Sequence, residues 1–129
     1  MENKFSVEII TPEKSILKSD TTEVIIPSYE GEMGILKDHI SLITFLRPGL
    51  VTIKNSGEKR FYIEEGTVEF LDNNLLILTS TATELENFKK EKIKEILEEA
   101  ENLYQSNNLS DKEKYLTSYK IETLKTINS

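Results

Sequence analysis

The chain has 129 residues, of which 37% are hydrophobic and 30% charged. This length suffices for one ordinary globular domain or a small domain with an appendage, but not for two full-sized cores. The formal net charge of −7 repels phosphate backbones, and no lysine and arginine cluster is interleaved with aromatic residues. Nucleic acid is therefore not an expected partner, and protein surfaces are.

The sequence contains no cysteine, which excludes disulfides, thiolate metal sites and cysteine nucleophiles and is compatible with a reducing compartment. The first residues, Met1 to Lys4, carry no signal-peptide pattern. No apolar run approaches the roughly 20 residues that span a bilayer. We therefore expect a soluble isolated chain without direct membrane insertion, so that any membrane association goes through another protein.

Short strand patterns fill the first two thirds of the chain. Alternating apolar and polar residues predict a half-buried strand over 5–11, followed by a shorter strand at 15–18. A β-branched run over 21–26 predicts a strand that stops at Pro27, because proline cannot donate to a ladder. Further strands are expected at 42–46, 50–54, 60–64, 67–71 and 75–79, the last one continuously apolar and so expected to be buried on both faces. This regular spacing predicts an antiparallel sandwich or barrel.

A glycine-containing stretch, Glu30 to His39, lies between two of these strands and contains the only histidine of the chain. Gly31 and Gly34 are three residues apart, and glycine allows positive φ or a close approach to another surface. We interpret the stretch as a loop. Hairpins and bulges use glycine in the same way, so the spacing alone is weak support for an interface.

Every glycine and proline precedes residue 82, where the pattern becomes helical. An apolar stripe predicts a first helix over about 84–105, a breaker follows at 105–108, and Ser110 with Glu113 fits a capping box that opens a second helix reaching near Ile127. The apolar residues of the second helix spread around it, so its docking face is not specified. The predicted fold class is α+β, with a β-sandwich domain at 1–83 and a two-helix hairpin at 84–129.

Several residues admit a catalytic and a structural interpretation. His39 lacks a second ligand-spaced partner, so a structural or interface role is favoured over a general base or metal ligand. Glu64 and Glu65 are adjacent in an extended segment and point to opposite faces, so they cannot share one substrate. Three tyrosines of the tail could hold a nucleotide base, but packing across the hairpin is favoured; these are Tyr104, Tyr115 and Tyr119.

Four stretches, taken in order and spacing, resemble the epsilon subunit of the F-type ATP synthase, called delta in mitochondria. They are residues 5–13, residues 30–36 with His39, residues 46–49 and residues 74–82. The resemblance implies a noncatalytic rotor subunit that couples ion flow through the membrane ring to ATP synthesis. Its implied partners are the gamma subunit and the membrane ring, at the cytoplasmic side of the membrane.

The same resemblance assigns interface residues. The family loop that faces the membrane ring matches Tyr29, Glu30, Gly31, Glu32, Met33 and Gly34. His39 matches a position near the gamma contact. In this interpretation Glu32 supplies a polar rim contact, which favours orientation more than affinity.

In the family, the two C-terminal helices fold against the sandwich or extend into the catalytic head of alpha and beta subunits, where they inhibit hydrolysis. Some members bind ATP through an acid and an arginine on the first helix. The matching positions here are Glu86, Lys89 and Lys90, and lysine lacks the planar fork of arginine. We therefore expect no bound cofactor and no ATP binding, and at most a degenerate nucleotide site.

Two other functions are compatible with the residues alone. One is a free-standing β-sandwich binding module whose helices recruit an unrelated partner. The other is a small hydrolase using Glu64 or Glu65, which is disfavoured because no acid and base groups converge in the sequence.

Overall fold

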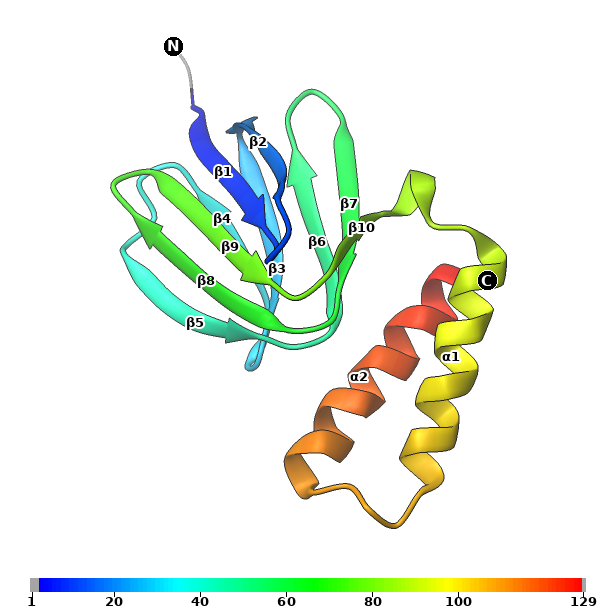
Figure 1. Ribbon diagram of the computed structural model, residues 1–129. Coiled ribbons are helices and arrows are strands. Elements are labelled where there is room, and N and C mark those ends of the chain that lie inside the picture. The colour runs from blue at the N-terminus through cyan, green and yellow to red at the C-terminus, as the bar shows by residue number, and fades with distance from the viewer. Residues whose placement is uncertain (1–2, 129) are drawn as a thin grey trace.

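The strand periodicity produces a β-sandwich followed by two helices, as the computed structural model of residues 3–128 shows (Figure 1). In the first strand, every second side chain is buried, starting from Phe5. The α+β fold class is confirmed. The strands are β1 Phe5–Ile10, β2 Ser15–Thr21, β3 Glu23–Ser28, β4 Gly31–Leu36, β5 Leu42–Leu46, β6 Gly49–Lys54, β7 Glu58–Ile63, β8 Gly66–Leu71, β9 Asn74–Thr79 and β10 Ala82–Glu84.

The sheet folds on itself into two layers (Figure 1). The strand order is β10-β7-β6-β3-β5-β8-β9-β1-β2, with β4 attached to β3. Strands β3 and β5 share a single pair, Ser28 with Leu46, and there the sheet passes from one layer to the other. The inward side chains of both layers form one core, which includes Val7, Ile26, Phe61 and Ile77. Strands β1 and β9 pair in parallel, which the expected antiparallel arrangement did not include.

Three strand predictions need correction. Strand β3 continues through Pro27 to Ser28, because the backbone polar groups of Pro27 point away from β4. The Pro27 carbonyl accepts the N–H of Arg47, the residue after β5, at 3.0 Å. The stretch Gly31–Leu36, interpreted as loop, is strand β4 and pairs with β3 along its length. Strand β9 is buried on one face only, since Leu78 on the other face is 44% exposed.

The helical part begins later than expected. Residues Ala82–Glu84 pair with β7 as strand β10, and a short 3-10 helix, η1, covers Leu85–Asn87. Helix α1 then runs over Lys90–Gln105 and helix α2 over Asp111–Asn128. The predicted capping box is present at the start of α2: the Ser110 N–H donates to Glu113 Oε1 at 3.0 Å, and the Glu113 N–H donates to the Ser110 hydroxyl at 3.1 Å.

The helical hairpin, α1 with α2, packs against the outer side of β6 and β7 (Figure 1). Buried Tyr62 of β7 is at the centre of this second apolar cluster, with its ring 5.4 Å from that of Phe88. Ile93 of α1 and Leu124 of α2 complete the buried part. The hairpin therefore rests on the sandwich through apolar burial, in addition to its own interhelical contacts.

Candidate partner-binding interface

The outer side of β1, β5, β8 and β9 carries several exposed or half-exposed apolar side chains, with Glu69 and Glu8 among them. The register aligns Phe45, Thr67, Leu78 and Ile10 in one row across the four strands. Exposed fractions are 78% for Ile43 and 65% for Phe45, values far above those of core residues. We call this surface the outer apolar face and define it by Ile10, Ile43, Phe45, Leu71, Leu76 and Leu78. Large apolar side chains gathered on one exposed face are typical of a protein interaction site.

Two shallow grooves shape the outer apolar face. One, of about 350 Å³, is bordered by Ile43 and Leu71 at the ends of β5 and β8. The other, of about 380 Å³, lies near Ile10 and Leu78 at the opposite ends of the strands. The helical hairpin covers the other layer of the sandwich and leaves β8 and β9 clear of the helices (Figure 1). Within residues 3–128, this face is therefore open to a partner.

The turn between β3 and β4 contains the first of the residues predicted from the family loop. Tyr29 and Glu30 form the turn itself, and Gly31 has φ = 129°, in the region that favours glycine. The Ser28 hydroxyl donates to the Gly31 carbonyl at 2.6 Å and closes the turn. We call residues 28–31 the Tyr29 turn. The positive φ of this turn explains why glycine occupies position 31.

The remaining residues of the predicted loop lie on β4. Glu32 is exposed and borders a groove with Arg47 and Glu122, whereas Met33 packs partly against the core. Gly34 has ordinary strand geometry opposite Ile25, so its backbone conformation does not require glycine. Because side chains alternate along a strand, these neighbours point to different sides and cannot act as one loop surface.

His39 lies beyond the far end of β4, away from the Tyr29 turn. Its ring meets the buried Phe70 edge-on at 6.0 Å, and its Nδ1 is 2.8 Å from the Ile40 carbonyl, which requires the hydrogen on Nδ1. The preceding residue is fixed to the β8–β9 turn, because Asp38 and Asn73 exchange hydrogen bonds of 2.7 and 3.0 Å. A six-residue strand spans roughly 20 Å, so the predicted interface residues form two zones.

The two carboxylates of Glu64 and Glu65 lie in different environments. Glu64 forms an ion pair with Lys120 at 3.0 Å and accepts a hydrogen bond from the Tyr62 hydroxyl at 3.3 Å. Glu65 is exposed. Burial, and next the nearby Glu64 charge, raise the pKa of Tyr62 far above its usual range. Within residues 3–128, no group of three histidine, cysteine or acidic side chains could hold a metal ion.

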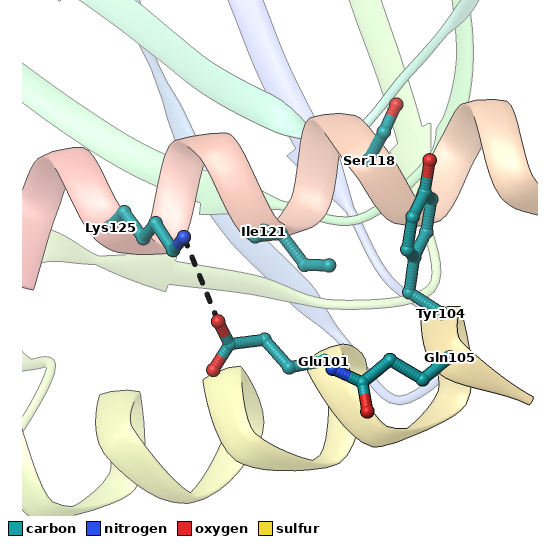
Figure 2. A pocket seen from close by; sticks show the side chains of 6 residues that line it. All are labelled: Glu101, Tyr104, Gln105, Ser118, Ile121 and Lys125. Atoms are coloured by element: carbon teal, nitrogen blue, oxygen red, sulfur yellow. Dashed lines mark ion pairs between the residues drawn. The ribbon is translucent and has the colours of Figure 1, made fainter.

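The three candidate nucleotide residues lie where η1 leads into α1. Glu86 lies on η1, and Lys89 and Lys90 stand at the start of α1, all three exposed. A groove of about 270 Å³ does lie between the helices, where Lys125 pairs with Glu101 at 3.6 Å (Figure 2). Its lining residues are Glu101, Tyr104, Gln105, Ser118, Ile121 and Lys125, so the three candidates are not among them.

The three tyrosines of the tail divide between two environments. Tyr104 is 43% exposed and lines the interhelical groove (Figure 2). Tyr115 instead contacts the sandwich: its hydroxyl donates to the Tyr29 carbonyl at 2.8 Å. The expectation of packing across the hairpin is wrong for Tyr115, because this part of α2 lies against the Tyr29 turn.

Comparison with known proteins identifies the family. The profile described as ATP synthase, Delta/Epsilon chain, beta-sandwich domain, matches residues 4–85. The ATP synthase epsilon chain of Pelagibacter ubique is 50% identical over 130 residues, which cover 99% of this chain and 100% of the relative. The chain belongs to the ATP synthase epsilon-chain family. The epsilon chain of Dichelobacter nodosus is 34% identical over 108 residues, covering 82% of this chain and 76% of the relative.

Solved structures agree with this epsilon-chain fold. A chain of the Euglena gracilis mitochondrial ATP synthase, in an assembly of OSCP, F1 and c-ring, superposes with a TM-score of 0.75 at 24% identity, covering 97% of this chain and 79% of that one. A chain from the central stalk and c-ring of the Tetrahymena thermophila mitochondrial ATP synthase gives 0.65 at 18% identity, covering 99% and 98%. Neither α1 nor α2, the helices of residues 3–128, is long and apolar enough to cross a membrane.

Proposed function

We propose that this epsilon-family chain is a noncatalytic subunit of the central stalk of an F-type ATP synthase, turning with the rotor and coupling ion flow to ATP synthesis. The observation that carries the proposal is the outer apolar face on β1, β5, β8 and β9, left open by the chain's own helices. An isolated surface of this kind leaves apolar area in water, and covering it with a partner is favourable.

The two zones of predicted interface residues suit two partners. The outer apolar face is proposed to dock on the gamma subunit, together with His39 and exposed Ile40, which precede strand β5. The Tyr29 turn and Glu32, at the other end of β4, are proposed to meet the polar loops of the membrane ring. Glu30 and Glu32 are exposed there and would set orientation through charge. The complex would lie at the cytoplasmic side of the membrane.

The helical hairpin is proposed as a mobile regulatory domain that can leave the sandwich and reach the alpha and beta subunits of the catalytic head. Support comes from the small set of buried hairpin side chains: Ile93, Ala100, Thr117 and Leu124 are the buried members of α1 and α2. The sandwich core is a separate cluster of its own. A hairpin held by so few buried side chains can detach at modest cost.

The docking proposal is tested by affinity for a purified complex of gamma subunit and membrane ring. Ile43→Glu places a charge on strand β5 of the outer apolar face and should weaken binding at least about tenfold, since the carboxylate would be buried without a partner. Leu103→Glu is the matched control, because Leu103 is 49% exposed on α1. Binding of Ile43→Glu at the strength of the unmodified chain would overturn the proposed docking surface. A chain that never co-purifies with gamma would favour the free-standing binding module.

A further inference from the structure

A stack of aromatic side chains joins α2 to the Tyr29 turn. The Tyr29 ring lies 5.7 Å from that of Tyr115, and Tyr115 lies 5.0 Å from Tyr119 on the next turn of the helix. Arg47 ends the stack, with its guanidinium carbon 3.8 Å from the centre of the Tyr119 ring. On the other side, Tyr29 contacts Phe45 of the outer apolar face at 6.1 Å. The stack thus runs from the helical hairpin to both proposed partner zones.

Hydrogen bonds fix the backbone of the Tyr29 turn to the same groups. The Tyr115 hydroxyl donates to the Tyr29 carbonyl at 2.8 Å, and Arg47 Nε donates to the Ser28 carbonyl at 3.1 Å. The Tyr29 N–H donates to the Phe45 carbonyl at 3.2 Å. Two consecutive carbonyls of the turn are therefore held by α2 itself and by the arginine that α2 covers. The hydroxyl of Tyr115 is thus bonded directly to the backbone of the turn.

We propose that Tyr115 is a positioning residue for the Tyr29 turn, so that docking of the helical hairpin and binding of a partner at this turn are coupled. The partner half of this inference rests on the proposed function. With the hairpin docked, the turn and Phe45 are held in one geometry before the partner arrives. With the hairpin released, the Tyr29 carbonyl and one side of the Tyr29 ring lose their contacts, and the partner must order the turn on binding.

The coupling acts in both directions. If the docked hairpin strengthens binding at the Tyr29 turn by a given factor, an occupied turn must stabilise the docked hairpin by the same factor. A subunit seated on its partner would then hold its helices against the sandwich more firmly than the free subunit does. The Tyr115 hydroxyl carries this link through a single hydrogen bond, which sets the expected size at about threefold to tenfold.

The first test uses the full chain alone and amide hydrogen exchange. Tyr115→Phe keeps the ring and removes only the donor to Tyr29, so exchange should become about threefold to tenfold faster both in α2 and at the amide of Tyr29. Tyr104→Phe is the matched control and should change neither segment, because Tyr104 lies on α1 in the interhelical groove. Faster exchange in α2 without any change at the Tyr29 turn would show that the contact stabilises hairpin docking but does not position the turn. That result would overturn the inference, as would no change in either segment.

The second test measures affinity for the purified complex of gamma subunit and membrane ring. Tyr115→Phe should bind about threefold to tenfold more weakly than the unmodified chain, and binding should slow exchange in α2 of the unmodified chain. Equal affinities, with the unmodified chain binding well, would overturn the inference while the proposed function stands. If the unmodified chain does not bind at all, the proposed function fails together with the partner half of the inference. Exchange in the free chain then decides the coupling between hairpin and turn.

Discussion

The Nζ of Lys120 on α2 lies 3.0 Å from Oε2 of Glu64, at the end of β7. Both side chains are about 70% buried, so this ion pair between the helical hairpin and the sandwich is partly shielded from solvent. We expect Lys120→Gln to weaken hairpin docking by about 1 kcal/mol, with a smaller loss at high salt. Amide exchange in α2 measures this. Lys92→Gln is the control, because Lys92 pairs with Glu95 within exposed α1; equal effects of the two variants would contradict the assigned role.

Gly66 allows β8 and β9 to approach closely at the start of β8. A Cβ added there would lie 2.1 Å from the Leu78 carbonyl oxygen, a backbone atom that cannot move alone. Gly66→Ala should therefore destabilise the sandwich by about 3 kcal/mol or more. Gly57→Ala is the matched control, since nothing lies within 4 Å of its Cβ position, and its effect should stay within about 0.5 kcal/mol. Urea unfolding compares the two, and similar midpoints would contradict the close approach.

The capping box makes the start of α2 sensitive to acid. Hydrogen bonds from the backbone N–H of Ser110, and next from its side chain, hold the pKa of Glu113 below its ordinary value of 4.5. The stabilising contribution of this carboxylate is therefore fully present above pH 4.5 and lost as the pH falls through the lowered pKa. Glu113→Gln should remove this part of the acid dependence of α2 helicity, followed by circular dichroism. Glu98→Gln, at an exposed site on α1, should leave the acid transition of the unmodified chain in place.

Removal of residues 89–129 should leave a folded sandwich. The core of the sandwich is a cluster separate from the one beneath the helices, and this cut keeps strand β10 and the Phe88 ring that covers Tyr62. We expect cooperative unfolding and a strand-rich circular dichroism spectrum, with some loss of stability from newly exposed Leu50. A molten product without a cooperative transition would show that the helices complete the core, and the proposed boundary near residue 84 would fall.

Much of the sandwich could be predicted because burial alternates with a period of two. The unbroken apolar run over 75–79 conceals this alternation and predicts burial on both faces. Leu76 and Leu78 instead point to the outside of β9, on the same face as Ile43 and Phe45 of β5, with β8 between the two strands. An apolar run on a strand of a two-layer sandwich, with no further layer to cover it, is itself a signal for an interface.

Other features had no local signal. The parallel pairing of β1 with β9 brings together segments almost 70 residues apart, which no short pattern encodes. Leu85 and Phe88 match the helical stripe, yet pairing of Ala82–Glu84 with β7 delays the helix until Lys90. The scattered apolar residues of α2 follow from its position, because this helix packs on α1 and on the sandwich at the same time. A single docking stripe was not to be expected.

Hydroxyl-radical footprinting of the chain, free and then assembled in the complete ATP synthase, tests the proposed docking most directly. Solvent-exposed aromatic and aliphatic side chains react with the radical, so covering Ile43, Phe45 and Leu71 should suppress their modification on assembly. The Tyr29 turn should be protected with them, while Leu103, an exposed residue of α1, reports whether the docked hairpin is covered as well. Undiminished modification of Ile43 and Phe45 in the assembled complex would contradict the account.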